Sequence, residues 1–510
     1  MHITQTVQTM QTTARQRWTA LVLLAAIEFM ILLDTAIVNI ALPAIKTGLH
    51  FSEANLPWIQ NAYLLVFGGF LLLGGRAADL FGRRRFYLLG LSLFTASSLL
   101  AGLAPTGGIL LLARALQGIG AAVVLPAEQS LLVTIFTDSD EFNRAFGIWG
   151  AVGAAGGISG ILLGGVLTQL VGWPWIFLIN VPVGILVLLV SPRLLPESRA
   201  DEADGKRQKL DLVGALAVTL AILLVAYAPI AGQEQGWSSP RALGSLIVAA
   251  VLLLIFVGVE ARASSPLVPL RLFRNRGSNG ANIVSFLVGA AHAPMFYLLS
   301  LYFQQALGYD ALTAGLAILP VGVGSLLFSF LVLPRALDHL GARGVLAGGM
   351  FLLAVGLVLF ARVPIPSSYV RDILPASLIV AIGLPAAFVG TNIAAVTAVA
   401  PAETGLASGL MNTTQRVGSG IGIAVLTAVF VARVGPLGPL NAHTNLATLA
   451  AGFQAGFLGA ALFAVLGAVL TLLLIRPIQR PKQAHLDAES GVESGIELAP
   501  AGARRLPFHH

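Results

Sequence analysis

The chain has 510 residues, of which 56% are hydrophobic and only 10% are charged. Soluble domains carry roughly 25% charged residues, so this composition excludes a protein whose whole surface faces water. The net charge of +7 does not indicate nucleic-acid binding, because the basic residues lie in short loops between apolar runs, and the absence of cysteine excludes disulfides and thiolate chemistry. The composition predicts an all-α integral membrane protein.

Fourteen apolar runs are long enough to cross a membrane, because a bilayer core about 30 Å thick needs about 20 helical residues. The first run follows Arg15 and Arg17 and continues through Asp34 to Leu42 without a small-residue cleavage site, which favours an uncleaved helix over a signal peptide. In chain order the runs lie at 18–42, 56–75, 85–104, 108–133, 144–168, 175–192, 211–231, 242–260, 281–303, 312–333, 344–361, 373–399, 417–434 and 450–475.

Basic residues indicate how these spans are oriented, because short cytoplasmic loops are enriched in Lys and Arg. With the N-terminus inside, Arg114 is the only one of the 30 basic residues that lies well inside a predicted span and not at its end. Few lie outside the cell: Lys46, Arg241, Arg362, Arg371 and Arg433. Both termini are therefore predicted to be cytoplasmic.

A short repeat follows the second and the tenth span. GGRAADLFGRRR (74–85) and PRALDHLGARG (334–344) share the pattern Asp-x-x-Gly-x-Arg, at Asp79, Gly82 and Arg84 and again at Asp338, Gly341 and Arg343. Both copies lie in predicted cytoplasmic turns. Many secondary transporters are built from internal repeats, with a substrate site at the interface of the repeats.

Two charged residues lie deep in predicted spans. A carboxylate near the bilayer centre, such as Asp34, costs about 2.5–3.5 kcal/mol on insertion scales and is a functional candidate by default. Arg114 lies at a similar depth in the fourth span, so Asp34 is its natural partner. The pair either takes part in proton coupling or only holds the first and fourth helices together.

Two further acids allow several interpretations. Glu128 lies about 40° around the helix from the face of Arg114 and closer to the inner mouth, where it is a second proton site, a cation-attracting residue or an acid paired with a loop arginine. Glu28 aligns with Asn39 on the first helix, and it is either a substrate-cation site or an inter-helix hydrogen-bond partner. A lone His292 in the ninth span is predicted to be structural.

Polar residues on the neighbouring helices complete the predicted substrate site. Gln60 and Tyr63 in the second span are expected to line the cavity. Gln117 falls close to the face of Arg114 in the fourth span. No cluster of metal ligands accompanies these residues, and no metal is expected.

Several motifs resemble those of one transporter family. GGRAADLFGRRR resembles the cytoplasmic signature loop of the major facilitator superfamily, and LARALQGIGAA (112–122) resembles its fourth-helix motif. WGAVGAAGGISGILLGG (149–165) resembles the glycine-rich fifth-helix motif of the antiporter branch. LLDTAIVNIALP (32–43) resembles the first-helix motif of the fourteen-span drug:proton antiporters, and WIFLINVPVG (175–184) and GLASGLMNTTQRVGSGIG (405–422) resemble other stretches of that family.

The resemblance implies a major facilitator fold with two six-helix bundles plus two extra helices. The predicted parts are a cytoplasmic N-terminus (1–17), an N-terminal six-helix bundle (18–192), a linker with two inserted transmembrane helices (193–278), a C-terminal six-helix bundle (279–475) and a disordered cytoplasmic tail (476–510). The sequence departs from the family pattern at Ile161, where proline is usual, and at Pro174, where arginine is usual. Glu28 and Glu128 are not part of the pattern.

The resemblance also implies roles for particular residues. It assigns Arg114 to the proton-transfer step. It implies a conformational latch in the loop after the second span, formed by Gly75, Asp79, Gly82, Arg83 and Arg84. Helix five is expected to make close contact at the interface of the two bundles through Gly153, Gly156, Gly157, Gly160, Gly164 and Gly165.

The predicted function is a proton-coupled efflux antiporter that exports amphipathic, cationic drug-like compounds by alternating access. It would be a monomer in the bacterial inner membrane, driven by the proton motive force without a cofactor; a periplasmic adaptor and an outer-membrane channel are expected only in a Gram-negative cell. An alternative is an exporter of one physiological compound such as a lipid, siderophore or antibiotic. A membrane-embedded enzyme lacks a clustered catalytic set, and a sensor lacks a sizeable soluble domain.

Overall fold

The computed structural model describes residues 14–53, 55–197, 211–263, 275–364, 367–399, 404–434 and 446–475, and the described residues contain no strand. They form 14 helical segments that are long and apolar enough to cross a membrane, as predicted. The predicted tail at 476–510 and most of the predicted N-terminal segment at 1–17 lie outside the described residues.

The helices match the predicted runs in order. The sixth span combines α6 with α7, and short π-helical segments (η2 and η3) extend the ninth span and begin the twelfth. The elements are α1 (Ala14–Leu49), α2 (Trp58–Phe81), α3 (Arg83–Gly102), α4 (Gly107–Ile135), α5 (Ser139–Leu170), α6 (Trp175–Leu178), α7 (Asn180–Leu194), α8 (Leu212–Gln235), α9 (Pro240–Glu260), α10 (Arg276–Leu301), η2 (Tyr302–Ala306), α11 (Ala311–Leu331), α12 (Leu333–Ala361), η3 (Tyr369–Ile373), α13 (Leu374–Thr397), α14 (Thr404–Val434) and α15 (Leu446–Leu474).

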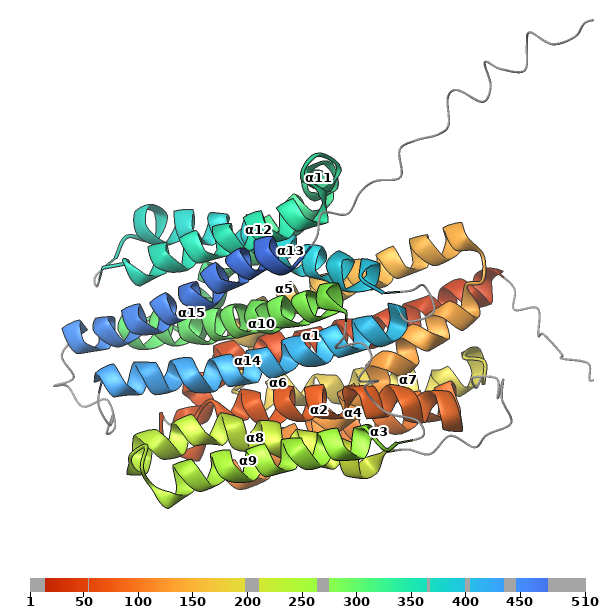
Figure 1. Cartoon of the computed structure of the whole chain (residues 1–510), viewed down its shortest axis with the longest axis horizontal. Helices are drawn as coiled ribbons and strands as arrows, with labels where there is room; N and C mark the ends of the chain where they lie inside the picture. Colours follow the sequence, from red (N-terminus) through yellow and green to blue (C-terminus); the bar gives the residue numbers. More distant parts are fainter. Residues whose placement is uncertain are drawn as a thin grey trace, which may run out of the picture.

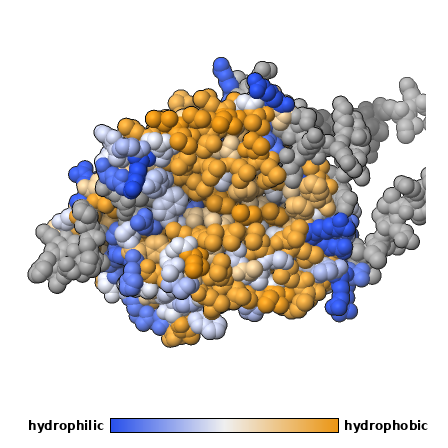
Figure 2. Space-filling model, turned by 90° about the horizontal axis from the view of Figure 1, so that it is seen from below, coloured by the Kyte–Doolittle hydropathy of each residue, from blue (hydrophilic) through white to orange (hydrophobic). Residues whose placement is uncertain are grey.

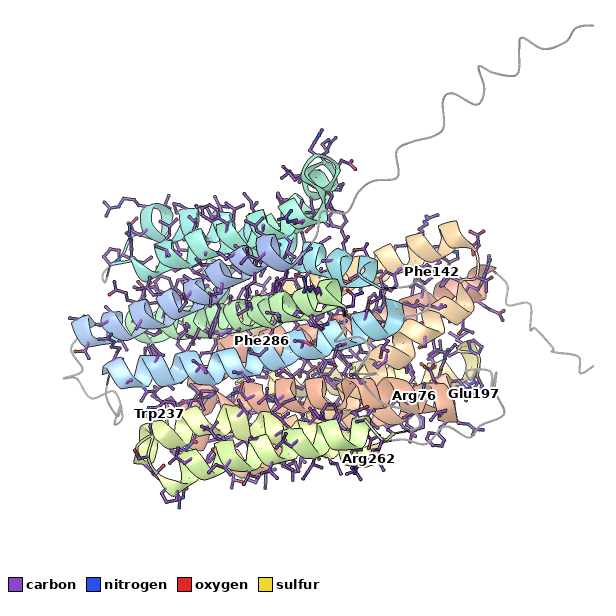
Figure 3. The ribbon with its side chains drawn as sticks, viewed as in Figure 1. Arg76, Phe142, Glu197, Trp237, Arg262 and Phe286 are labelled. Atoms are coloured by element: carbon purple, nitrogen blue, oxygen red, sulfur yellow. The ribbon has the colours of Figure 1, made fainter. Side chains whose placement is uncertain are left out.

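The outer surface is apolar along the middle of the helices. Large side chains such as Leu189, Ile247 and Leu254 are mostly exposed, and Figure 2 shows a broad hydrophobic surface with hydrophilic residues mainly toward its two ends. Arg76, Glu197 and Arg262 lie toward one end and Trp237 lies toward the opposite end (Figure 3). This distribution fits a multi-pass membrane protein whose middle is covered by lipid.

The helix pairs repeat between two parts of the chain, which we name the N-terminal half (α1–α7) and the C-terminal half (α10–α15). α1 packs on α5 and α2 on α4, and in the same order α10 packs on α14 and α11 on α13. α8 and α9 lie side by side along one edge, and α8 packs against α2 and α14 (Figure 1). Gly82 and Gly341, the matching glycines of the sequence repeat, both adopt positive φ, of 115° and 67°.

Two seams join the halves, because α2 packs on α14 and α5 packs on α11. Hydrogen bonds add to them at the predicted outer end, where Gln304 Nε2 donates to the Ile40 carbonyl oxygen at 2.9 Å and Gln305 Nε2 donates to Glu53 Oε1 at 3.3 Å. Glu53 also pairs with Lys46. The outer end of α1 is therefore tied to α10 and η2.

A proline in α1 contributes one more contact between the halves. Pro43 has no N–H, so the Asn39 carbonyl one turn earlier has no donor within its own helix. Ser300 Oγ of α10 donates to this carbonyl oxygen at 2.5 Å. The defect in α1 thus creates an acceptor that the other half of the protein satisfies.

The glycines of α5 do not pack where the sequence analysis placed them. A Cβ at Gly160 would lie 2.6 Å from the Leu33 carbonyl oxygen of α1, and Gly156 and Gly164 also face α1. Only Gly165 in this motif packs on the other half, against α11. The prediction that these glycines contact the other half is therefore wrong for most of the motif. Glycines spaced by four residues lie on one face of α5, and this face lets the α1 backbone approach closely.

One helix begins well before its predicted span. The sequence placed the thirteenth span at 417–434, but α14 begins at Thr404, so Arg416 lies inside the helix and not in a cytoplasmic loop. The polar stretch Asn412–Arg416 lowers the local hydropathy and concealed this part of the helix. Packing against α2 and α10 stabilises it there.

We expect Gly156→Ala to destabilise the fold, because its Cβ would meet the Phe29 backbone of α1. Overpacking of this kind costs about 1–3 kcal/mol. The thermal unfolding midpoint of the purified protein should fall. Gly150→Ala is the matched control in the same helix, since a Cβ there meets nothing within 4 Å; equal midpoints for the two variants would contradict the close contact.

Candidate functional site

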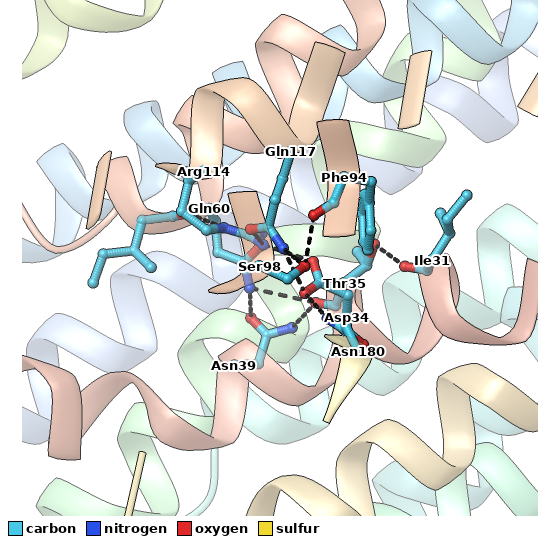
Figure 4. Close-up of polar contacts among 11 residues, drawn as sticks. Ile31, Asp34, Thr35, Asn39, Gln60, Phe94, Ser98, Arg114, Gln117 and Asn180 are labelled. Carbon is cyan, nitrogen blue, oxygen red and sulfur yellow. Dashed lines mark hydrogen bonds and ion pairs between the residues drawn. The ribbon is translucent and has the colours of Figure 1, made fainter. Parts of the chain in front are cut away.

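Asp34 lies in the middle of α1 and accepts hydrogen bonds from three side chains. Arg114 Nη1 lies 2.6 Å from Asp34 Oδ2, and Asn180 Nδ2 and Gln117 Nε2 donate to Oδ1 at 2.9 and 3.3 Å. The donors come from α4 and α7, so the carboxylate joins three helices (Figure 4). The predicted pairing of Asp34 with Arg114 is present.

Arg114 is held on several sides. Besides Asp34, its Nη1 donates to Gln117 Oε1 at 2.9 Å and its Nε donates to the Ile59 carbonyl oxygen at 3.1 Å. The guanidinium carbon lies 4.3 Å from the centroid of the Tyr63 ring. Both charged side chains are 0% exposed. Each charge is therefore stabilised by the other in place of water.

A cavity of about 410 Å³ lies between the halves. Among the predicted site residues, Asn39, Gln60, Gly153 and Gly157 line it, whereas Glu28, Tyr63 and Gln117 do not. Its lining comes from three helices of the N-terminal half (α1, α2 and α5) and four of the C-terminal half (α10, α11, α13 and α14). A cavity that both halves line is where an alternating-access transporter binds its substrate.

The ion pair lies directly behind the cavity wall. Thr35 lines the cavity and is the next residue after Asp34. Gln60 lines it as well, and its Nε2 donates to Asn39 Oδ1 at 3.0 Å and to the Thr35 carbonyl oxygen at 3.5 Å. A change of charge at Asp34 therefore acts on the cavity surface through the neighbouring residue of α1.

Two cationic or titratable residues in the cavity were not predicted as site residues. Arg416 of α14 and His292 of α10 both line it and are half-buried. The His292 ring lies 5.2 Å from the Phe296 ring and 5.0 Å from the Phe388 ring, so the predicted structural role describes its contacts but not its access to the cavity. Arg416 was missed because the predicted span began at residue 417, one residue after Arg416, whereas α14 begins at Thr404.

Asn180 and Ser98 were also missed. Asn180 opens α7 and binds Asp34, and Ser98 of α3 accepts from Gln117 Nε2 at 2.7 Å. A polar residue within the apolar run at 175–192 was the available signal for Asn180. Ser98 had no comparable signal, since serine is common in membrane helices.

The two extra acids, Glu28 and Glu128, are buried and take no part in the hydrogen bonds around Asp34. Glu128 Oε1 accepts from Trp149 Nε1 of α5 at 2.6 Å. Of the three roles considered for Glu128, the pair with a loop arginine is not observed, because Glu128 is 0% exposed and lies inside the helix bundle; the other two roles stay predictions. Glu28 is buried beside Gly153 of α5 and is close enough to Glu128 and Arg416 to interact with both electrostatically.

Among the described residues, the hydrogen bonds of the predicted latch residues stay within the N-terminal half and the segment that follows α7. Asp79 Oδ1 accepts from Arg83 Nε at 3.0 Å, and Arg83 Nη1 donates to Thr134 Oγ1 of α4 at 2.8 Å. Arg84 Nη1 donates to the Leu195 carbonyl oxygen at 3.1 Å. Gly75 packs on Pro126 of α4. Among the described residues no hydrogen bond or ion pair joins Asp79 to the C-terminal half, and the latch role stays a prediction.

Comparison with known proteins identifies the family of this chain. The model of the Major Facilitator Superfamily matches residues 24–423 and 281–507. A puromycin resistance protein of Streptomyces alboniger is 38% identical over 416 residues, which cover 81% of this chain and 82% of that protein. A cephamycin export protein of Amycolatopsis lactamdurans is 40% identical over 414 residues, which cover 81% of this chain and 84% of that protein.

A crystal structure of a POT family transporter superposes with a TM-score of 0.66 at 16% identity, covering 90% of this chain and 97% of that one, which is a likeness of fold. The fold and the cavity between its halves define a polytopic helical transporter. The chain belongs to the major facilitator superfamily. It is therefore a transporter and not an enzyme.

We expect Arg114→Ala to destabilise the protein more than Asp34→Asn. The first change removes bonds to Asp34, Gln117 and the Ile59 carbonyl, whereas asparagine keeps the size of Asp34 and one acceptor oxygen. Both changes break the buried pair, which costs about 3–5 kcal/mol, and Arg114→Ala adds the loss of the bonds to Gln117 and the Ile59 carbonyl. Thermal unfolding of the purified variants measures the difference, with Arg83→Gln as a control that breaks a partly exposed pair. A larger loss in Arg83→Gln than in Arg114→Ala would contradict this assignment.

Proposed function

We propose that this chain is a proton-coupled efflux antiporter that exports amphipathic drug-like compounds. The observation that carries the proposal is the buried Asp34–Arg114 pair, one residue behind the wall of a cavity shared by both halves. The resistance and export functions named for two relatives support the direction and the kind of substrate.

The mechanism follows from the charges at Asp34. Ionised Asp34 holds Arg114, Asn180 and Gln117 around it. A proton on the carboxyl removes the charge attraction and releases one or more of these donors, which changes the packing of α1 against α4 and α7. Because Thr35 and Asn39 of α1 line the cavity, the same change alters the substrate site. Proton and substrate then compete through one helix.

The energy source in this proposal is the proton motive force across the membrane, without a cofactor. Each charge moved across 100 mV supplies about 2.3 kcal/mol, so one or two protons suffice to drive useful accumulation ratios. The protein would lie in the inner membrane of a bacterium as a monomer, with both termini cytoplasmic. A periplasmic adaptor and an outer-membrane channel would join it only in a Gram-negative cell.

The structure fits the inward-facing step of alternating access. At the predicted outer end, Ser300 and Gln304 bind α1, and Gln305 binds Glu53 in the loop that follows α1. In the outward-facing step the halves rock, the outer bonds break and Asp79 approaches the start of α14, where a helix N-terminus favours a carboxylate.

The charge of the substrate is a separate question. The sequence predicts a cation bound by Glu28, but Glu28 does not line the cavity, whereas Arg416 does. The cation preference stays a prediction. Export of one physiological antibiotic is the second candidate, and the cephamycin export function named for one relative favours it.

We expect Asp34→Asn to abolish proton-driven efflux while the protein still folds and binds substrate. An amide at this position cannot take up and release a proton in the working pH range. Substrate-induced proton release from purified protein, measured at several pH values, tests this directly. Efflux of a fluorescent dye from cells, with and without a protonophore, tests the coupling in the membrane.

Glu128→Gln provides the matched control, since it neutralises a second buried acid that binds Trp149 and not Arg114. It should release protons as the wild type does if Asp34 alone couples. Wild-type proton release from Asp34→Asn would show that Asp34 is not the coupling residue.

A further inference from the structure

Two arginines lie inside the described helix bundle, and their surroundings differ. Arg114 is 0% exposed and has a carboxylate, an amide oxygen and a backbone carbonyl around it. Arg416 forms no hydrogen bond or ion pair with any described residue. Its guanidinium carbon instead lies 4.1 Å from the centroid of the Phe67 ring of α2.

The ring does not neutralise Arg416. A cation–π contact stabilises by about 0.5–2 kcal/mol, which is less than the cost of holding a charge at membrane depth. The electrostatic neighbours of Arg416 are Glu28 on α1, Tyr63 on α2 and His292 on α10. Glu28 is the only carboxylate among them, and it lies beyond ion-pair distance. The guanidinium donors therefore remain available to whatever occupies the cavity.

The cavity around Arg416 has the character of a site for an amphipathic acid. Among the described residues that line it there is no Asp or Glu. Apolar side chains such as Leu32, Phe296 and Phe388 form much of the wall. Near Arg416 on α14, Gln415 and Ser419 also face the cavity. An apolar body with one negative end matches these surfaces better than a body with a positive end.

We propose that Arg416 binds an anionic group of the transported compound, a carboxylate in the simplest case, so that amphipathic acids and zwitterions are substrates. The planar guanidinium offers paired N–H donors that match both oxygens of a carboxylate. The bound anion replaces water at Arg416 and supplies the counter-charge that the protein lacks there. This inference rests on the proposed export function for the identity of the cavity as a substrate site.

The test compares two dyes that differ only in the carboxylate. Tetramethylrhodamine is a zwitterion with a free carboxylate, and its methyl ester is a cation with the same apolar body. Binding of each dye to the purified protein is measured by fluorescence polarisation, with protein-free micelles as background. We expect the wild type to bind the free carboxylate about tenfold more tightly than the ester, a difference of about 1.4 kcal/mol.

Three variants assign that preference to Arg416. Arg416→Gln should bind both dyes alike, with ester binding close to that of the wild type, and Arg416→Lys should keep part of the preference. Arg371→Gln removes an exposed arginine that pairs with Asp372 and should keep all of it. Thermal unfolding confirms that each variant is folded.

Several outcomes would overturn the inference. Equal or tighter binding of the ester by the wild type would do so and would favour the predicted cation site, even if Arg416→Gln does not fold. A full carboxylate preference in folded Arg416→Gln would also do so. Dye binding needs no proton gradient, so it tests Arg416 separately from the antiport. A failure of proton-driven efflux would contradict the proposed antiport and would not change the dye preference.

Discussion

Burying a charge at the depth of a bilayer centre costs free energy that a counter-charge, hydrogen bonds or water must offset. The architecture around Asp34 follows from this constraint, since α1, α4 and α7 are held together by the donors that the carboxylate requires. The same constraint makes the arrangement switchable. A proton on Asp34 removes the charge that holds Arg114, and this loosens the packing of these helices.

Helix α1 has a different kind of neighbour on each side. Charged and amide side chains of α4 and α7 bind its Asp34 face, while the glycine face of α5 lies directly against its backbone at Phe29, Leu33 and Ile37. Small residues let two helix backbones approach closely. Hydrogen bonds on one side and close backbone packing on the other therefore fix α1 within the N-terminal half.

The sequence was sufficient to predict the span count, the helix order and the Asp34–Arg114 contact, because long apolar runs and a buried charge each have one low-energy solution in a membrane. It was insufficient where packing overrides hydropathy. Arg416 was assigned to a loop because its polar neighbours hide the first part of α14. Glu128 found its partner in Trp149, a residue on another helix that no spacing rule connects to it.

Pro43 has a consequence for how the outer end opens. Because proline cannot donate, the Asn39 carbonyl depends on Ser300 for its hydrogen bond while the outer end is closed. When the halves separate, water that enters the gap can take the place of Ser300, and an exchange of one partner for water is nearly neutral in free energy. Opening at this point therefore requires water to reach the Asn39 carbonyl. The halves can separate toward an aqueous vestibule, whereas separation toward lipid would leave the carbonyl without a hydrogen-bond donor.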